Sequence, residues 1–102
     1  NKITTEEQLD SLFQDSYDRP VALIKHSDTC GISSDIMDQL GSVEAEINVI
    51  VIQQNRDLSN SVAVRIEHRH QSPQAFVIKD GKAIYHATHY GISPAEIENQ
   101  LK

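Results

Sequence analysis

The chain has 102 residues, a length that suits one domain with a modest hydrophobic core, and we expect residues 1–102 to form that domain. Hydrophobic residues make up 38% and charged residues 24%, with a net charge of −6, which is the balance of a soluble globular protein. No basic stripe is present and no apolar run approaches the roughly 18 residues that cross a bilayer, so neither nucleic acid nor a membrane is an expected partner.

The first part of the chain predicts a helix followed by a buried strand. Thr4 and Glu7 have the spacing of a capping box, and the apolar residues within Leu9–Phe13 recur at helical spacing after it. Pro20 then precedes Val21–Ile24, a short continuous apolar run that is typical of a strand buried on both faces.

The middle of the chain predicts a second helix, a strand and a third helix. Apolar residues at helical spacing follow Cys30, and this helix is expected to end near Gly41. Ile47–Ile52 is β-branched almost throughout, which predicts a central strand covered on both faces. Asp57 is the expected cap of the third helix, whose apolar face lies within Leu58–Ile66.

The last third of the chain predicts a β-hairpin and a final helix. Ala75–Ile78 and Lys82–Ala87 are separated by Asp80–Gly81, a two-residue hairpin signal. Ser93 and Pro94 are typical of the cap and first position of a helix. The resulting order, α, β, α, β, α, β, β, α, predicts an α/β protein with a thioredoxin-like fold: a mixed central sheet with helices on both faces.

Cys30, the only cysteine, directly precedes the second predicted helix. Free N–H groups and a partial positive charge at a helix N-terminus favour a thiolate, which is the attacking species in disulfide exchange. Ser33 stands where a dithiol protein has its second cysteine; its hydroxyl can donate a hydrogen bond to the thiolate but cannot resolve a mixed disulfide. The pattern predicts monothiol chemistry, and the alternative is that Cys30 is an ordinary small buried residue.

A lone cysteine also bears on the compartment of the protein. It cannot form an internal disulfide, which favours a reducing environment, and no secretory signal is visible in the sequence. We therefore expect a cytoplasmic protein.

Ser72 and Pro73 immediately precede the strand of the predicted hairpin. Proline has no N–H to donate to a sheet, so it belongs at the first residue of a strand. In thioredoxin-like folds the proline at this place is cis and lies beside the reactive sulfur, and the spacing from Cys30 fits that placement. The alternative is a plain proline at the start of a strand.

Three segments together resemble the bacilliredoxin C family. Lys25–Ser33 is similar to the family's lysine-histidine-serine run leading to Thr-Cys-Pro-Ile-Ser, and Gln53–Asn60 resembles its segment before the third helix. His70–Phe76 is similar to the family's His-Glu-Ser-Pro-Gln-x-Phe stretch. The resemblance runs from about Val21 to the end of the chain.

The resemblance implies a monothiol oxidoreductase that removes a low-molecular-weight thiol, bacillithiol, from mixed disulfides on client proteins. Cys30 would be the nucleophile, no cofactor would be tightly bound, and a second thiol or a reductase would regenerate the protein. The residues expected to surround the thiol and bind its substrate are Thr29, Gly31, Ile32, Ser33, Ser72 and Pro73.

Gly31 departs from the family pattern, which has proline at this position. Cys30-Gly31-Ile32-Ser33 thereby approaches the Cys-Gly-Phe-Ser of monothiol glutaredoxins, which can share an iron–sulfur cluster between two subunits. No Gly-Gly pair follows the hairpin, although glutaredoxins usually have one near their glutathione site. Gly31 thus favours a cluster-binding carrier as one alternative, and the missing Gly-Gly pair counts against it. A non-catalytic interaction module with the same fold is the other alternative.

The histidines offer two further hypotheses. His68 and His70 in an extended segment would place two imidazoles on one side, as a metal site does, but no cysteine or carboxylate spacing completes such a site, and no metal is predicted. His26 ends the strand before Cys30, where it would either act electrostatically on the thiol or point away from it.

Overall fold

The structure is a computed structural model that describes residues 1–102. Its strands are β1 (Val21–His26), β2 (Ile47–Val51), β3 (Gln74–Lys79) and β4 (Lys82–Thr88). They form one four-stranded sheet in the order β2-β1-β3-β4. β1 is parallel to β2 and antiparallel to β3, and β3 and β4 form an antiparallel hairpin. The predicted mixed sheet is confirmed.

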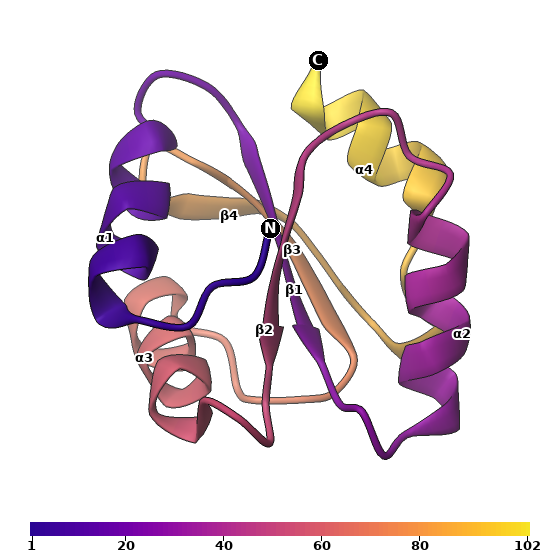
Figure 1. The fold of residues 1–102 in the computed structure, drawn as a ribbon. Coiled ribbons are helices and arrows are strands. Elements are labelled where there is room, and N and C mark those ends of the chain that lie inside the picture. The colour runs from indigo at the N-terminus through magenta and orange to yellow at the C-terminus, as the bar shows by residue number, and fades with distance from the viewer.

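Helices cover both faces of this sheet, as predicted. α1 and α3 lie on one face, and α2 and α4 lie on the other (Figure 1). None of the helices is long and apolar enough to cross a membrane. The helices are α1 (Glu6–Asp15), α2 (Gly31–Leu40), α3 (Arg56–Ile66) and α4 (Pro94–Leu101), with a short 3₁₀ turn, η1 (His89–Gly91), before the last.

The alternation of β1 divides the interior into two hydrophobic cores. Leu23 belongs to a core of 12 buried residues beneath α1 and α3, whereas Ile24 belongs to a core of eight beneath α2 and α4. Because successive side chains of a strand point to opposite faces, the same alternation sends Lys25 toward α3 and His26 toward α2. Two neighbouring polar residues at the end of β1 therefore meet different surroundings.

Two of the predicted helix caps are wrong by one or two residues. The N-cap of α1 is Thr5, whose hydroxyl accepts from the Gln8 N–H at 3.1 Å. The pair Thr4 and Glu7 has the same spacing, so only the backbone distinguishes the two possible capping boxes. The N-cap of α3 is Asn55, and Asp57 lies in the first turn, where a carboxylate still interacts favourably with the helix dipole.

The prediction that Ile47–Ile52 is a central strand is also wrong, because β2 is at one edge of the sheet. Its outer side is covered by the first residues of the chain: the Ile3 N–H donates to the Val49 carbonyl at 2.8 Å, and the Val49 N–H donates to the Asn1 carbonyl at 2.7 Å. This short pairing protects an edge whose residues are as β-branched as those of an interior strand.

The hairpin and the last helix begin as predicted. Asp80 and Gly81 both have positive φ, 54° and 75°, which a type I′ turn requires. A Cβ at Gly81 would lie 2.7 Å from the hydroxyl of the exposed Tyr17, so a larger residue there would also displace that side chain. The Ser93 hydroxyl accepts from the Glu96 N–H at 3.2 Å, which caps α4.

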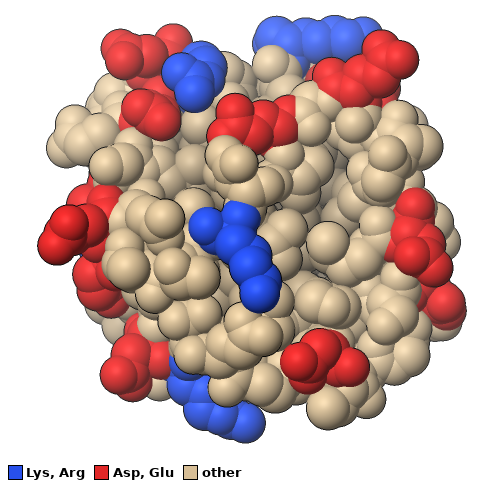
Figure 2. All heavy atoms as spheres, in the orientation of Figure 1, with Lys and Arg blue, Asp and Glu red and all other residues tan.

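Charge is spread over the surface without a basic patch on the face seen in Figure 2. The lysine and arginine side chains there are separated from one another by uncharged or acidic residues.

Candidate active site

Cys30 is the N-cap of α2, immediately after the turn that follows β1, and its side chain is half-buried and free. Its carbonyl accepts the first helical hydrogen bond, from the Ser34 N–H at 3.1 Å. No side chain caps this helix, so the N–H groups of its first turn remain available to a negatively charged sulfur. The predicted position of Cys30 at the helix start is confirmed.

Ser33 is fully buried and faces the end of β1. Its hydroxyl accepts from the Ser27 N–H at 3.0 Å and lies 2.7 Å from His26 Nδ1. The expectation that this hydroxyl donates to Cys30 is not met in the structure, because these two partners hold it and no hydrogen bond joins it to the sulfur. His26 thus points toward α2, where it pairs with Ser33.

Gln53, just beyond the end of β2, fixes the turn that carries Cys30. Its amide oxygen accepts from the Asp28 N–H at 3.2 Å. Its amide nitrogen donates to the hydroxyls of Ser27 at 2.6 Å and Thr29 at 3.1 Å. Sequence reasoning missed this role, although Gln53 stands at the carboxyl end of a strand next to β1 and begins one of the segments that resemble the family.

The Ser72–Pro73 peptide bond is cis. Gln74 pairs with Lys25 in the antiparallel register of β3 and β1, so the residues before β3 lie at the sheet edge where β1 ends and the turn to Cys30 begins. Pro73 is buried, and the Ser72 hydroxyl oxygen is buried without a hydrogen-bond partner. The structure thus brings Cys30 and the Ser72–Pro73 pair to one edge, with Gly31 exposed and Ile32 half-buried in the first turn of α2.

Tyr90, in η1, lies on the same edge and was not expected from the sequence. Its hydroxyl donates to Asp35 Oδ2 at 2.9 Å, which ties η1 to α2. The hydrogen bond to Asp35 raises the pKa of Tyr90, and burial and the negative charges of Asp35 and Cys30 raise it further. The phenol therefore stays a hydrogen-bond donor at neutral pH.

The opposite face of the sheet holds a buried lysine. Lys25 is fully buried, and its amine lies 3.3 Å from His70 Nδ1, which also pairs with the Ser59 hydroxyl at 3.0 Å. Burial lowers the pKa of Lys25 from 10.5 to about 8. Burial, followed by the positive charges of Lys25 and Arg56, lowers the pKa of His70.

His68 and His70 have separate surroundings, although they are two residues apart. The His68 ring stacks on His86 with 4.2 Å between centroids, whereas His70 pairs with Lys25. No group of three or more histidine, cysteine or carboxylate side chains lies together in the structure. The two imidazoles therefore have different structural partners rather than a shared one.

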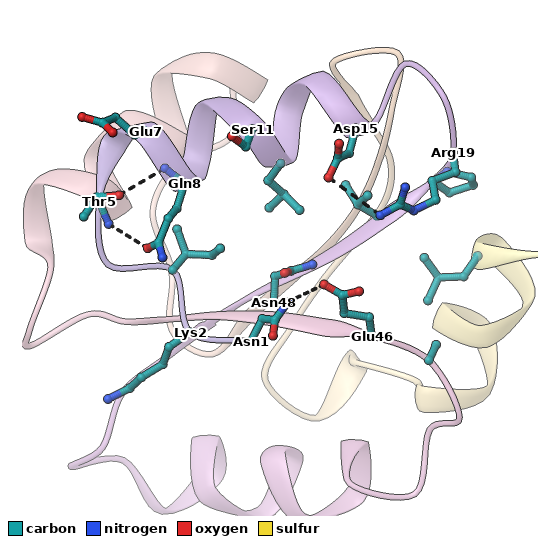
Figure 3. A pocket seen from close by; sticks show the side chains of 16 residues that line it. Asn1, Lys2, Thr5, Glu7, Gln8, Ser11, Asp15, Arg19, Glu46 and Asn48 are labelled. Carbon is teal, nitrogen blue, oxygen red and sulfur yellow. Dashed lines mark hydrogen bonds and ion pairs between the residues drawn. The ribbon is translucent and has the colours of Figure 1, made fainter.

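A hollow of about 730 Å³, shown in Figure 3, has no lining residue in the turn to Cys30 or in α2. It is bounded by α1, by the first residues of the chain and by the start of β2, and Asn1 and Glu46 are hydrogen bonded within it. Because β1 ends at the opposite edge of the sheet, this hollow is separate from the thiol. Its lining residues do not include Cys30, so the candidate thiol site lies outside it.

The fold and this edge define a class of protein. A four-stranded mixed sheet, one cysteine at the start of α2 and a cis-proline before β3 are the features of a monothiol oxidoreductase of the thioredoxin superfamily. The chain matches the family model of the monothiol bacilliredoxin BrxC over residues 1–97, and it belongs to that family.

Solved structures agree with this fold. One, described as a proposed oxidoreductase with a thioredoxin fold, has a TM-score of 0.88 at 27% identity, over 99% of this chain and 92% of its own. Thioredoxin from Fasciola hepatica has a TM-score of 0.78 at 18% identity, over 100% of this chain and 99% of its own. A mutant thioredoxin from Halobacterium salinarum has a TM-score of 0.71 at 14% identity, over 98% of this chain and 85% of its own.

Proposed function

We propose that the chain removes a low-molecular-weight thiol, bacillithiol, from mixed disulfides on client proteins, with Cys30 as the sole nucleophile. The observation that carries this proposal is the single cysteine at the uncapped start of α2, with a serine three residues later. Membership of the monothiol bacilliredoxin family supports the same reaction. The reaction needs no tightly bound cofactor, and its partners are the modified clients and the small thiol.

The exchange conserves electrons. The Cys30 thiolate attacks the sulfur of the small thiol, a new disulfide forms between them, and the bond from the small thiol to the client breaks. The client sulfur leaves as a thiolate and takes a proton from water. A second molecule of small thiol, as its thiolate, or a reductase then attacks the disulfide on Cys30 and regenerates the free protein.

The cis-proline segment is the proposed guide for the incoming disulfide. Ser72 and Pro73 precede β3 at the edge where Cys30 lies, and the buried Ser72 hydroxyl has no partner within the protein. Backbone groups beside Pro73 would align the three sulfurs of the exchange, and Thr29 and Ile32 would flank them. A reducing cytoplasm is the proposed setting, since the lone cysteine must return to the free thiol after each cycle.

Mass spectrometry of a model client tests the reaction. A peptide with one cysteine in mixed disulfide with bacillithiol is mixed with equimolar protein, and both intact masses are followed. We expect the peptide to lose the mass of the small thiol and Cys30 to gain it, whereas Cys30→Ser should transfer nothing. Persistence of the peptide disulfide with the unsubstituted protein would refute the proposal.

The same experiment discriminates the remaining alternatives. A parallel peptide that carries glutathione shows whether the protein prefers one thiol. Transfer from neither peptide, together with iron and sulfide bound after anaerobic reconstitution with a thiol, would favour the cluster carrier that Gly31 suggests. Transfer from neither peptide and no cluster would favour the interaction module.

A further inference from the structure

Tyr90 is an exposed aromatic side chain that is held in place from two directions. It is 62% exposed, an unusual fraction for an aromatic side chain whose position is otherwise restrained. Its hydroxyl is bound to Asp35 on α2 at 2.9 Å. One residue earlier, the His89 N–H donates to the Pro73 carbonyl at 3.0 Å. η1 therefore connects the two elements that flank Cys30: α2, at its second turn, and the cis-proline segment.

The backbone of η1 turns sharply to make this connection. His89 has φ 53°, in the left-handed region that few residues other than glycine adopt. Ile92, two residues after Tyr90, is buried in the core beneath α2 and α4 and anchors the other end of the turn. The ring of Tyr90 is thus presented to solvent from a fixed backbone, which is the arrangement of a recognition residue rather than of a core residue.

The order of the sulfurs in the exchange decides which part of the substrate Tyr90 meets. The small thiol supplies the central sulfur and becomes bonded to Cys30, whereas the client sulfur departs on the far side. The substituent of the small thiol therefore lies close to the first turn of α2, the helix to which Asp35 ties the Tyr90 side chain. An aromatic face packs against C–H groups even on a polar substituent, because its energy comes from contact area as well as from ring geometry.

We propose that Tyr90 is a specificity-determining residue that contacts the small thiol of the mixed disulfide, and that Asp35 positions its ring. This inference rests on the proposed function, since it assumes that Cys30 attacks the sulfur of the small thiol. The ring makes the contact, and the hydroxyl serves to hold the ring over the edge where Cys30 lies. Asp35 is a positioning residue, because it acts through the phenol and not on the substrate.

The proposal predicts an order among four variants. Tyr90→Ala removes the ring and should have the largest effect, whereas Tyr90→Phe and Asp35→Ala keep the ring but release it, with smaller and similar effects. Asp35→Asn retains a carbonyl oxygen that accepts from the phenol and should behave most like the unsubstituted protein. Tyr17→Phe is the matched control, since Tyr17 is 58% exposed beside the hairpin turn at Gly81, outside the active site.

The measurement is kcat/KM with one peptide that carries either bacillithiol or glutathione. Tyr90→Ala should change the ratio of the two values by at least about threefold, mainly through KM, because the ring contacts the small thiol, the one part in which the two substrates differ. Alkylation of Cys30 by iodoacetamide, which carries no such substituent, should stay within about twofold of the unsubstituted rate.

Two failures are distinguishable. If the unsubstituted protein reduces the peptides and Tyr90→Ala leaves the ratio of the two kcat/KM values unchanged, Tyr90 does not distinguish the small thiols. The inference alone is then wrong. If the unsubstituted protein reduces neither peptide, the proposed function is wrong and the inference falls with it.

Discussion

Lys25 and His26 are adjacent at the end of β1, yet the two faces of the sheet treat them differently. His26 faces α2, where it pairs with Ser33 in a network of hydrogen bonds around the turn to Cys30. Lys25 faces α3, where its amine is fully buried with His70 as its only hydrogen-bond partner. On the α2 side the buried Ser33 hydroxyl has two hydrogen-bond partners, whereas on the α3 side the buried Lys25 amine has no carboxylate beside it.

This contrast shows how the fold holds Cys30 at the edge of the sheet where β1 ends. Hydrogen-bonded neutral groups cost little to bury, so the network of Ser33, Ser27 and Gln53 can fix the position of Cys30 without destabilising the fold. A buried cation that is not paired with an anion opposes folding, which its lowered pKa reflects. Substitutions in the hydrogen-bond network beside α2 should therefore change both the activity and the stability of the protein. Substitution of Lys25, which faces α3, should change its stability alone.

The strongest test of this comparison is Lys25→Met. The folded-state pKa of about 8 lies below the unfolded value of 10.5, so the unfolded chain binds more protons between these pH values and stability rises as pH increases through that window. Replacing the amine by an apolar side chain should stabilise the protein at pH 7, by at most about 3 kcal/mol. Urea unfolding at pH 7 and pH 9.5 measures this, and the alkaline rise should shrink in the variant.

Lys82→Met is the control for that experiment, because Lys82 is exposed on β4 and its loss changes the net charge equally. It should leave both the stability and its pH dependence nearly unchanged. Peptide reduction by Lys25→Met should stay within about twofold of the unsubstituted rate. A loss of stability at pH 7 would show that the amine supports the fold, and the contrast between the two faces would fail.

The second test addresses the α2 side through Ser33→Ala. This substitution leaves the buried Ser27 N–H without its acceptor, which should cost about 1–2 kcal/mol of unfolding free energy. Because Ser27 begins the turn to Cys30, peptide reduction should also slow. Ser34→Ala is the matched control: Ser34 is exposed on the same helix, and its loss should change neither quantity by much. Equal effects of the two substitutions would mean that the network does not hold the turn.

The sequence predicted most of the fold because its signals are local. Strands, the Asp80–Gly81 turn and the Ser93 cap depend on neighbours within a few residues, and each lies where it was expected. The edge position of β2 was missed because β-branched content indicates burial, and the segment Asn1–Ile3 that supplies this cover comes from 46 residues away in the chain.

The site was predictable only in part, for the same reason. Cys30 and Pro73 carry local signals, a helix start and a strand start, and the fold brings them to one edge. Nothing local to Gln53 or Tyr90 indicates which groups they bind, since their partners lie 24 to 26 and 55 residues away and the hydrogen bonds exist only once the sheet has formed. The direction in which Ser33 points depends likewise on the burial of one face of α2.

Gly31→Pro has the smallest expected effect and asks whether the α2 side depends on flexibility. The backbone of Cys30, with φ −109° and ψ 121°, already lies in the region that a following proline requires. A Cβ at Gly31 would meet nothing within 4 Å, and the N–H of the first helical residue has no carbonyl within the helix to which it can donate. Proline should therefore stabilise the protein by about 0.4–1 kcal/mol, by restricting the unfolded chain.

Gly31→Ala separates the two consequences of this change, since alanine restricts the backbone but keeps the N–H. Cys30 alkylation that slows in Gly31→Pro and not in Gly31→Ala would show that this one N–H stabilises the thiolate. Equal rates in the two variants would mean that the remaining amides of the first turn suffice, which is the result we expect because several N–H groups share that task. Destabilisation by proline in urea unfolding would instead show that α2 needs glycine at its start. The backbone at the start of α2 would then be strained.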